Sequence, residues 1–371
     1  MLIKLEHRIL LPVVVLMLST MHSGLAIEKS EQRLVSPELL EPVGLKILWE
    51  NILPTKTGES LERLLILGDQ IYAISDKSYM LCLQRESNKR IFGKTLELGG
   101  LKVGELSLYN DKLLSVSGSR LYEIDPNTGI GHSTIDVEYG IVCPAARNNS
   151  FIYLAGADRR LHVLRAEDKV QVFKVAAGND SIITTVLADE AFIVFGTDRG
   201  NIISILPNQP VHLWKFDASG AIVGSIARDG MSLYFASEDM NVYRLDIIGP
   251  PEGWKLVWKY QTNGMLNTTP CVAKSIVYQV IYGKGLTAIN KNNGTFLWSV
   301  PLGIGFLAEA KGKAYVITKD GTLVVMDNNT NKRLYSVNFA GVTRYAANIV
   351  DSKIYIADKL GRIACLQPLE K

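Results

Sequence analysis

One short apolar pattern recurs eight times along this chain, at a spacing of about 40 residues. The copies are Gln70–Ile74, Lys112–Val116, Phe151–Ala155, Phe192–Gly196, Ser232–Ala236, Ile276–Val280, Lys313–Ile317 and Lys353–Ala357. A repeat of this length is typical of a four-stranded β-propeller blade. We therefore predict an all-β fold, an eight-bladed β-propeller of four-stranded antiparallel blades.

The residues between the copies follow a fixed order. A polar turn such as Asp198–Gly200 comes first, followed by a second strand and then a turn rich in Asn and Gly, such as Asn290–Gly294. Asp, Asn and Gly in these places favour tight hairpins. The strand before each copy holds small residues, as in Pro144–Ala146, which suits an inner strand near the propeller axis.

An aromatic residue ends most of the repeats. These residues are Phe92, Phe173, Trp214, Trp258, Trp298 and Tyr335, and only the second repeat lacks one. We expect each to lie on the outermost strand of its blade, wedged against the next blade, because an aromatic side chain buries a large area.

The two ends of the chain complement each other. The eighth repeat stops after Cys365–Gln367 without an outer strand, whereas Leu45–Glu50 precedes the first repeat and matches Val211–Lys215. We predict that this N-terminal segment supplies the missing strand of the last blade. Such a closed ring leaves no exposed sheet edges at the ends of the array.

The N-terminal residues predict export. Lys4 and Arg8 precede the apolar stretch Ile9–Leu18, and Gly24–Ala26 offers small residues for cleavage. We assign residues 1–26 to a signal peptide, 27–44 to a linker and 45–371 to the propeller. A membrane anchor is the alternative, but a span needs about 20 apolar residues. No cysteine lies near the cleavage position, so we expect no lipid at an N-terminal cysteine.

Charge and cysteine content narrow the function classes. Forty basic and thirty-seven acidic side chains give a formal net charge of +3 without a long basic run, so nothing indicates nucleic-acid binding.

The four cysteines are Cys82, Cys143, Cys271 and Cys365. We interpret them as small buried thiols. A Cys82–Cys365 disulfide stays open, because both residues occupy the same place in neighbouring repeats.

The best copies of the repeat resemble a known family. Gly285–Asn290 with Gly294–Trp298, and Leu121–Gly129, resemble the pyrroloquinoline-quinone-like (PQQ-like) propeller repeat, and the resemblance covers Leu45–Leu369. Within that family the chain is most similar to the BamB group of outer-membrane assembly factors. BamB proteins are typically lipoproteins, and this chain lacks the acylated cysteine. Their partner-binding loops have no motif that matches here.

The resemblance implies a non-enzymatic scaffold or adaptor in the periplasm or cell envelope. Its partner would be an envelope protein, such as an outer-membrane assembly complex, and the chain would be a monomer within that complex. The rival class is a quinoprotein dehydrogenase, which shares the repeat. Quinoprotein dehydrogenases share two features, a longer chain and a pair of adjacent cysteines. No Cys-Cys dipeptide occurs in this sequence. We expect no cofactor.

Candidate binding residues lie near the inner strands. Glu62, Glu105 and Glu309 could collect a cation at the channel mouth. The interpretation we favour is a set of solvated mouth residues balanced by Arg63 and Arg344. A carbohydrate or small-ligand binder using this mouth stays open as a third function. His132, His162 and His212 fall in different repeats without paired spacing, so we expect neither a metal site nor a catalytic residue.

Overall fold

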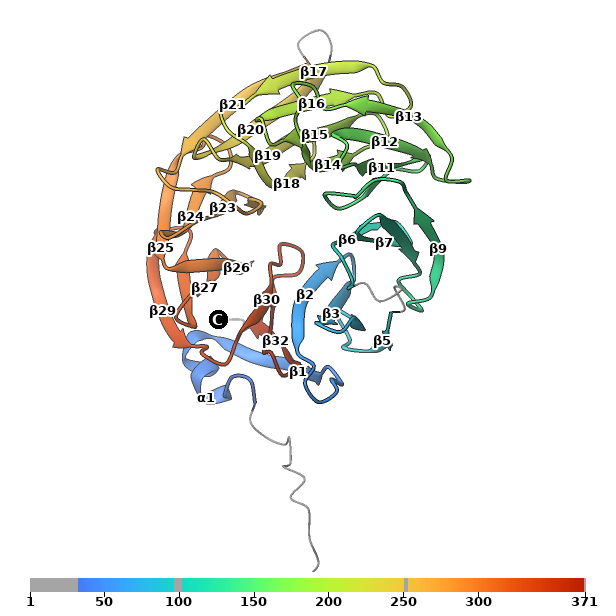
Figure 1. Cartoon of the computed structure of the whole chain (residues 1–371). Coiled ribbons are helices and arrows are strands. Elements are labelled where there is room, and N and C mark those ends of the chain that lie inside the picture. The colour runs from blue at the N-terminus through green and yellow to red at the C-terminus, as the bar shows by residue number, and fades with distance from the viewer. Residues whose placement is uncertain (1–32, 97–101, 250–252, 370–371) are drawn as a thin grey trace, which may run out of the picture. The chain divides into compact units, whose positions relative to one another are not determined.

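Short runs of apolar and β-branched residues, separated by Gly, Asn and Asp turns, form eight four-stranded antiparallel sheets arranged around a ring (Figure 1). The computed structural model describes residues 33–96, 102–249 and 253–369. Within the first seven blades, strands follow the chain from the inside of the ring to the rim. The predicted all-β, eight-bladed propeller is confirmed.

The first four blades cover the N-terminal half of the ring. Their strands are β2 (Leu61–Leu67), β3 (Gln70–Ser75), β4 (Tyr79–Gln84) and β5 (Arg90–Thr95); β6 (Leu106–Tyr109), β7 (Lys112–Ser117), β8 (Arg120–Ile124) and β9 (Gly131–Asp136); β10 (Ala146–Arg147), β11 (Phe151–Ala155), β12 (Arg160–Arg165) and β13 (Gln171–Ala176); and β14 (Ile183–Ala188), β15 (Ile193–Thr197), β16 (Asn201–Ile205) and β17 (His212–Asp217).

The last four blades complete it. Their strands are β18 (Ile222–Asp229), β19 (Ser232–Ser237), β20 (Asn241–Gly249) and β21 (Gly253–Gln261); β22 (Cys271–Val272), β23 (Ile276–Ile281), β24 (Gly285–Asn290) and β25 (Phe296–Pro301); β26 (Gly303–Ala310), β27 (Lys313–Thr318), β28 (Thr322–Asp327) and β29 (Lys332–Asn338); and β30 (Arg344–Ala346), β31 (Ile354–Ala357), β32 (Arg362–Pro368) and β1 (Leu45–Ile52).

The eighth blade closes the ring as predicted. β1 pairs antiparallel with β32, with Leu45 opposite Pro368 and Ile52 opposite Arg362. The first and last parts of the propeller therefore share one sheet (Figure 1). This pairing covers the outer edge of β32 that an open array would leave unpaired.

The hydrophobic core lies between the blades. Eight clusters of buried residues each join two neighbouring blades. The middle strands are buried on both faces, as β15 and β16 illustrate. This is why the recurring pattern reads as a nearly continuous apolar run. Six blades also bury a tyrosine on their second strand: Tyr72, Tyr153, Tyr234, Tyr278, Tyr315 and Tyr355.

The end of the interval predicted as a linker is folded. It contains a short helix, α1 (Pro37–Leu40), and a 3₁₀ turn, η1 (Glu41–Val43). Leu40 and Val43 are buried in the same cluster as residues of the seventh and eighth blades. The packed part of the chain therefore begins ahead of β1, at Leu34. The predicted signal peptide, residues 1–26, lies outside the described residues. No helix in the described ranges has the length and hydropathy needed to cross a membrane.

The predicted aromatic wedges all lie on outermost strands, but they differ in burial. Phe92, Trp258 and Trp298 are buried against the following blade. Tyr335 on β29 is 42% exposed, so the expected wedge is wrong there. Its neighbour is the eighth blade, whose third and fourth strands are not joined by a turn.

All four cysteines are free thiols, and the Cys82–Cys365 disulfide does not form. Cys82, Cys143 and Cys365 are buried. Burial raises the pKa of the Cys143 thiol to about 12, so this thiol stays protonated at neutral pH. Such thiols behave as small apolar residues.

Candidate functional site

The structure brings only part of the predicted charged set together. Arg63 on β2 forms an ion pair with Glu105, with 3.5 Å between the guanidinium and the carboxylate. Arg63 also donates to the carbonyl oxygens of Val103 and Gly104, the latter at 2.9 Å. These contacts link the inner strand of the first blade to the segment that leads into the second. Glu62, next to Arg63, is exposed.

The other two predicted residues lie apart from this pair. The Glu309 carboxylate on β26 accepts a hydrogen bond from the Tyr278 hydroxyl at 2.8 Å, which joins the sixth and seventh blades. Burial and the nearby Glu309 charge raise the pKa of Tyr278. Arg344 on β30 donates to the Thr343 carbonyl at 2.8 Å. Glu309 therefore lies at the junction of the sixth and seventh blades, whereas Arg344 contacts the backbone of its own blade.

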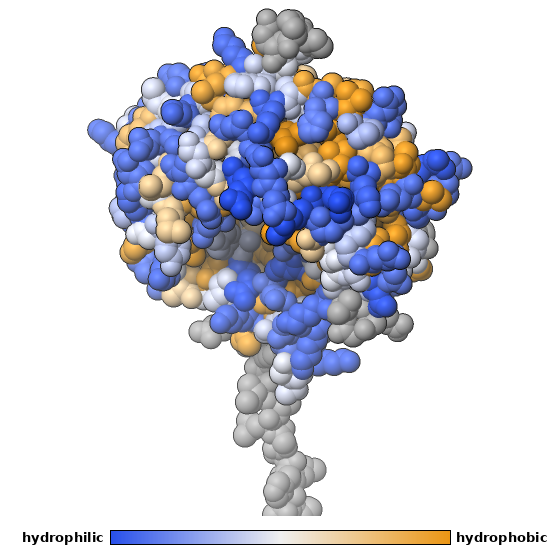
Figure 2. Space-filling model, turned by 45° about the horizontal axis from the view of Figure 1, so that its top comes forward, coloured by the Kyte–Doolittle hydropathy of each residue, from blue (hydrophilic) through white to orange (hydrophobic). Residues whose placement is uncertain are grey.

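An apolar groove lies at the rim between the fourth and fifth blades, and we call it the rim groove. Its volume is about 470 Å³. Its apolar walls are formed by Phe192, Leu213, Trp214, Met231, Ile247 and Ile248. Leu213, Met231 and Ile248 are 43%, 49% and 50% exposed, respectively. Hydrophobic residues gather in patches between hydrophilic ones in the upper half of Figure 2, over the blades at the top of Figure 1.

The groove exists because the fifth blade has a long outer hairpin. β20 and β21 each span nine residues, which exceeds every other strand of the described ranges. Trp254 on β21 reaches back to the fourth blade, where its indole N–H donates to the Lys215 carbonyl at 2.9 Å. Its ring lies edge-on to Phe216, with 5.0 Å between centroids. The hairpin is thereby fixed as one wall of the groove.

Charged residues border the rim groove. Arg228 pairs with Asp189 and lies over the Phe192 ring, 5.2 Å from its centroid. Burial alone would raise the pKa of Asp189. Hydrogen bonds from the Ala191 N–H and from Arg228 outweigh this effect and hold the pKa below its usual range. An apolar groove with a charged border is typical of a protein-binding surface.

Sequence reasoning missed this groove. Its walls come from two repeats, and neither repeat carries an unusual motif. The available signal was spacing, because the interval from Ser232 to Ile276 is the longest between copies. The extra residues lengthen the β20–β21 hairpin.

Across the described ranges, no group of three or more His, Cys, Asp or Glu residues is arranged to hold a metal ion.

Comparisons with known proteins agree with this architecture. A family model described as "Outer membrane protein assembly factor BamB" matches residues 199–336 and, overlapping them, 238–369. The crystal structure of BamB from Moraxella catarrhalis superposes with a TM-score of 0.67 at 14% sequence identity, covering 87% of this chain and 97% of that one.

A designed propeller shares the fold as well. The computationally designed Ika8 protein superposes with a TM-score of 0.65 at 14% identity, covering 85% of this chain and 98% of that one. The search of curated protein sequences gave no match. The family model matches the C-terminal part of the propeller, residues 199–369, and the solved structures share its fold. Both findings agree with the resemblance seen in the repeats, so the chain is a β-propeller whose repeats are similar to those of the BamB family.

Proposed function

We propose that this chain is a non-enzymatic scaffold or adaptor of the bacterial cell envelope that binds a protein partner through the rim groove. The observation that carries the proposal is the groove itself, a cavity of about 470 Å³ in which three apolar side chains, Leu213, Met231 and Ile248, are about half exposed. Exposed apolar surface of this kind costs solubility unless a partner covers it. The BamB-like family supports an envelope role in outer-membrane protein assembly.

The partner we propose is a protein segment that presents apolar side chains in an extended conformation. β17 is the terminal strand of its sheet, so one of its edges has no neighbouring strand in that sheet. Leu213 on β17 lines the groove. A segment added along this edge would gain main-chain hydrogen bonds and insert alternate side chains into the groove.

The remaining assignments belong to the same proposal. Residues 1–26 would be removed on export, and the protein would act in the periplasm without an N-terminal lipid. Glu62, Arg63, Glu105, Glu309 and Arg344 would be additional contact residues near the inner strands of different blades. No cofactor or metal enters this role.

Site-specific cross-linking in the envelope tests the proposal. A photo-reactive residue at Leu213 or Met231 should capture a component of the outer-membrane assembly machinery, identified by mass spectrometry. The matched control is Val350, which is 65% exposed on the eighth blade. We expect no such adduct there. Equal adducts from all three positions, or none from the groove, would reject the rim groove as the binding surface.

A charge in the groove provides a second test. Met231→Asp should abolish co-purification of the captured partner, because a carboxylate in an apolar contact loses its hydration. Val350→Asp should leave co-purification intact. Both side chains are exposed, so each substitution should change stability by at most about 0.5 kcal/mol, as a thermal melt can verify.

A further inference from the structure

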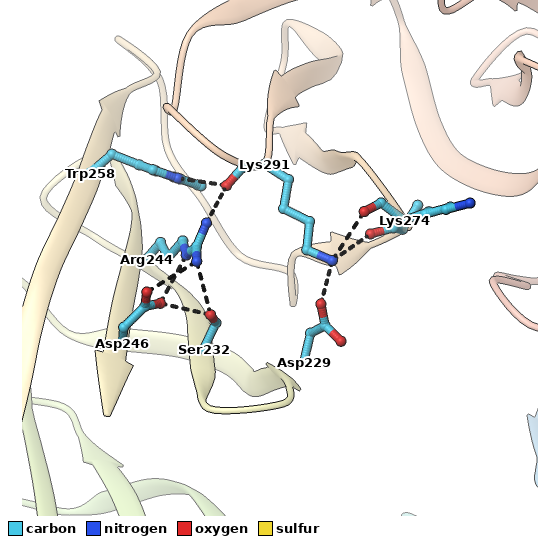
Figure 3. Close-up of polar contacts among 8 residues, drawn as sticks. Asp229, Ser232, Arg244, Asp246, Trp258, Lys274 and Lys291 are labelled. Carbon is cyan, nitrogen blue, oxygen red and sulfur yellow. Dashed lines mark hydrogen bonds and ion pairs between the residues drawn. The ribbon is translucent and has the colours of Figure 1, made fainter. Parts of the chain in front are cut away.

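A hairpin turn covers a hydrogen-bonding group of the preceding blade at several blade junctions. Figure 3 shows this at the junction between the fifth and sixth blades. The Lys291 carbonyl, in the β24–β25 turn, accepts from the Trp258 indole at 2.9 Å and from Arg244 at 3.0 Å. The Lys291 ammonium bonds Asp229 and the carbonyls of the β22–β23 turn. The turn is therefore fixed on both sides.

Two further junctions follow the same rule. The Tyr153 hydroxyl of the third blade donates to the Pro207 carbonyl in the β16–β17 turn at 3.1 Å. The Trp298 indole of the sixth blade donates to the Asn328 side-chain oxygen in the β28–β29 turn at 3.1 Å. In each case the following blade places an acceptor oxygen over a buried donor of the preceding one.

The eighth blade has no such turn. Its third strand, β32, ends at Pro368, and its fourth strand, β1, begins at Leu45, so the two are not connected as a hairpin. A cavity of about 110 Å³ lies in that place, and we call it the closing pocket. It is lined by Gly44, Lys311, Lys313, Tyr315, Tyr335 and Pro368, among others.

The closing pocket is lined by a tyrosine whose counterpart in the third blade is covered by a turn. Tyr315 on β27 occupies the same strand position as Tyr153 and is only 1% exposed. Within the part of the chain that the structure describes, its hydroxyl has no hydrogen-bond partner. Burial raises the pKa of Tyr315 to about 12, so the hydroxyl keeps its proton and can donate. The ammonium groups of Lys311 and Lys313 add positive charge beside it.

The Asp327 carboxylate competes for the charge of Lys313. Asp327 lies opposite Lys313 in the strand register, but it also accepts hydrogen bonds from the backbone N–H groups of Asn329 at 2.8 Å and Thr330 at 3.3 Å. A phenol donor next to an ammonium group favours an anionic oxygen ligand. The cavity has room for one small acidic group.

We propose that the closing pocket binds a carboxylate group, whose oxygen takes the place of the acceptor that a turn supplies at the three junctions described above. Tyr315 donates to this oxygen and Lys313 pairs with its charge. The carboxylate belongs to a free small acid or to an acidic side chain of a peptide. This site is separate from the rim groove and does not depend on the proposed function.

An NMR titration of the protein with glutarate tests the proposal. We expect saturable binding of glutarate and none of the neutral analogue glutaramide. Tyr315→Phe and Lys313→Gln should each weaken glutarate binding by about tenfold, the usual effect of losing one hydrogen bond to a charged group. A short peptide with one Asp, compared with glutarate, distinguishes the sources. Tighter peptide binding assigns the carboxylate to a protein, and equal binding assigns it to a free acid.

Tyr153→Phe is the matched control. It removes a hydroxyl that already bonds Pro207, so it should lower the melting temperature but leave glutarate affinity unchanged. Tyr315→Phe should weaken glutarate binding and leave the melting temperature unchanged. Equal affinity for glutaramide, or full affinity in Tyr315→Phe, would overturn the proposal. So would a Glu370→Gln chain that binds glutarate about tenfold more tightly, because the chain's own carboxylate would then be the occupant.

Discussion

One buried carboxylate, that of Glu123, connects the second and third blades. The Glu123 carboxylate on β8 of the second blade is only 6% exposed. It accepts from Arg147 of the third blade, from Lys169 in the β12–β13 turn at 2.8 Å, and from Ser133 at 2.9 Å. Burying an ion pair costs free energy of desolvation, so the pair adds little net stability. Removing one partner is strongly destabilising, because the other charge is then left buried without a partner.

Glu123→Gln should therefore destabilise the protein, and the effect should depend on pH. Burial raises the pKa of Glu123, but hydrogen bonds from Lys169 and Ser133 and the Arg147 charge hold it below its usual range. A lowered pKa adds stability above the unfolded value, and this stability is lost as pH falls through the folded value. We expect a loss of about 3 kcal/mol at pH 7 and a smaller loss at pH 3, measured by urea unfolding.

Glu167→Gln is the control for this substitution, because Glu167 is exposed in the same β12–β13 turn. It should leave the unfolding midpoint nearly unchanged at both pH values. The same deficit for Glu123→Gln at pH 3 and pH 7 would mean that the carboxylate contributes through shape and not through charge.

At the scale of elements, the hairpin turns set the spacing between blades. In the β24–β25 turn, Gly294 has a φ of +73°, and an added Cβ would lie 2.7 Å from the Trp258 ring. Glycine is therefore required here for two reasons. It adopts the left-handed backbone conformation, and it leaves room for close contact with the preceding blade.

Gly294→Ala should cost about 2 kcal/mol and perturb the fluorescence of Trp258. Gly283→Ala separates the two causes, because Gly283 has a φ of +72° and open space around its Cβ position. That control should cost only about 1 kcal/mol, from backbone strain. Equal losses for the two variants would show that the contact with Trp258 does not limit the blade spacing.

Most strands could be predicted because each blade repeats the same local pattern, so the eight copies supported one another. The contacts between blades could not be predicted from this pattern. Tyr335 occupies a wedge position in its own repeat, yet it is 42% exposed, because its burial depends on a turn that the eighth blade lacks. The pair Arg63–Glu105 forms, whereas Glu309 bonds Tyr278 of the sixth blade and Arg344 bonds the neighbouring Thr343 carbonyl. Such outcomes depend on the relative positions of two blades, which one repeat does not encode.

At the scale of the whole molecule, the ring depends on its N-terminal segment. Residues ahead of β1 extend the closure that the sequence predicted, since Leu40 is buried together with Leu45 of β1 in the cluster between the seventh and eighth blades. Truncating one large buried side chain costs about 2–5 kcal/mol. Losing both therefore removes a large share of the 5–15 kcal/mol that stabilises a typical domain.

A chain that begins at Leu53 should consequently fail to form a stable monomer, whereas a chain that begins at Leu34 should keep full stability. The shorter chain lacks α1, η1 and β1, so it exposes both the apolar surface of the seventh blade and the outer edge of β32. An unpaired sheet edge next to apolar surface promotes association between copies. We expect oligomers in light scattering and faster proteolysis for the shorter chain. If that chain stayed monomeric with an unchanged melting temperature, the blades would be stable without closure, and β1 would serve only to join the ends.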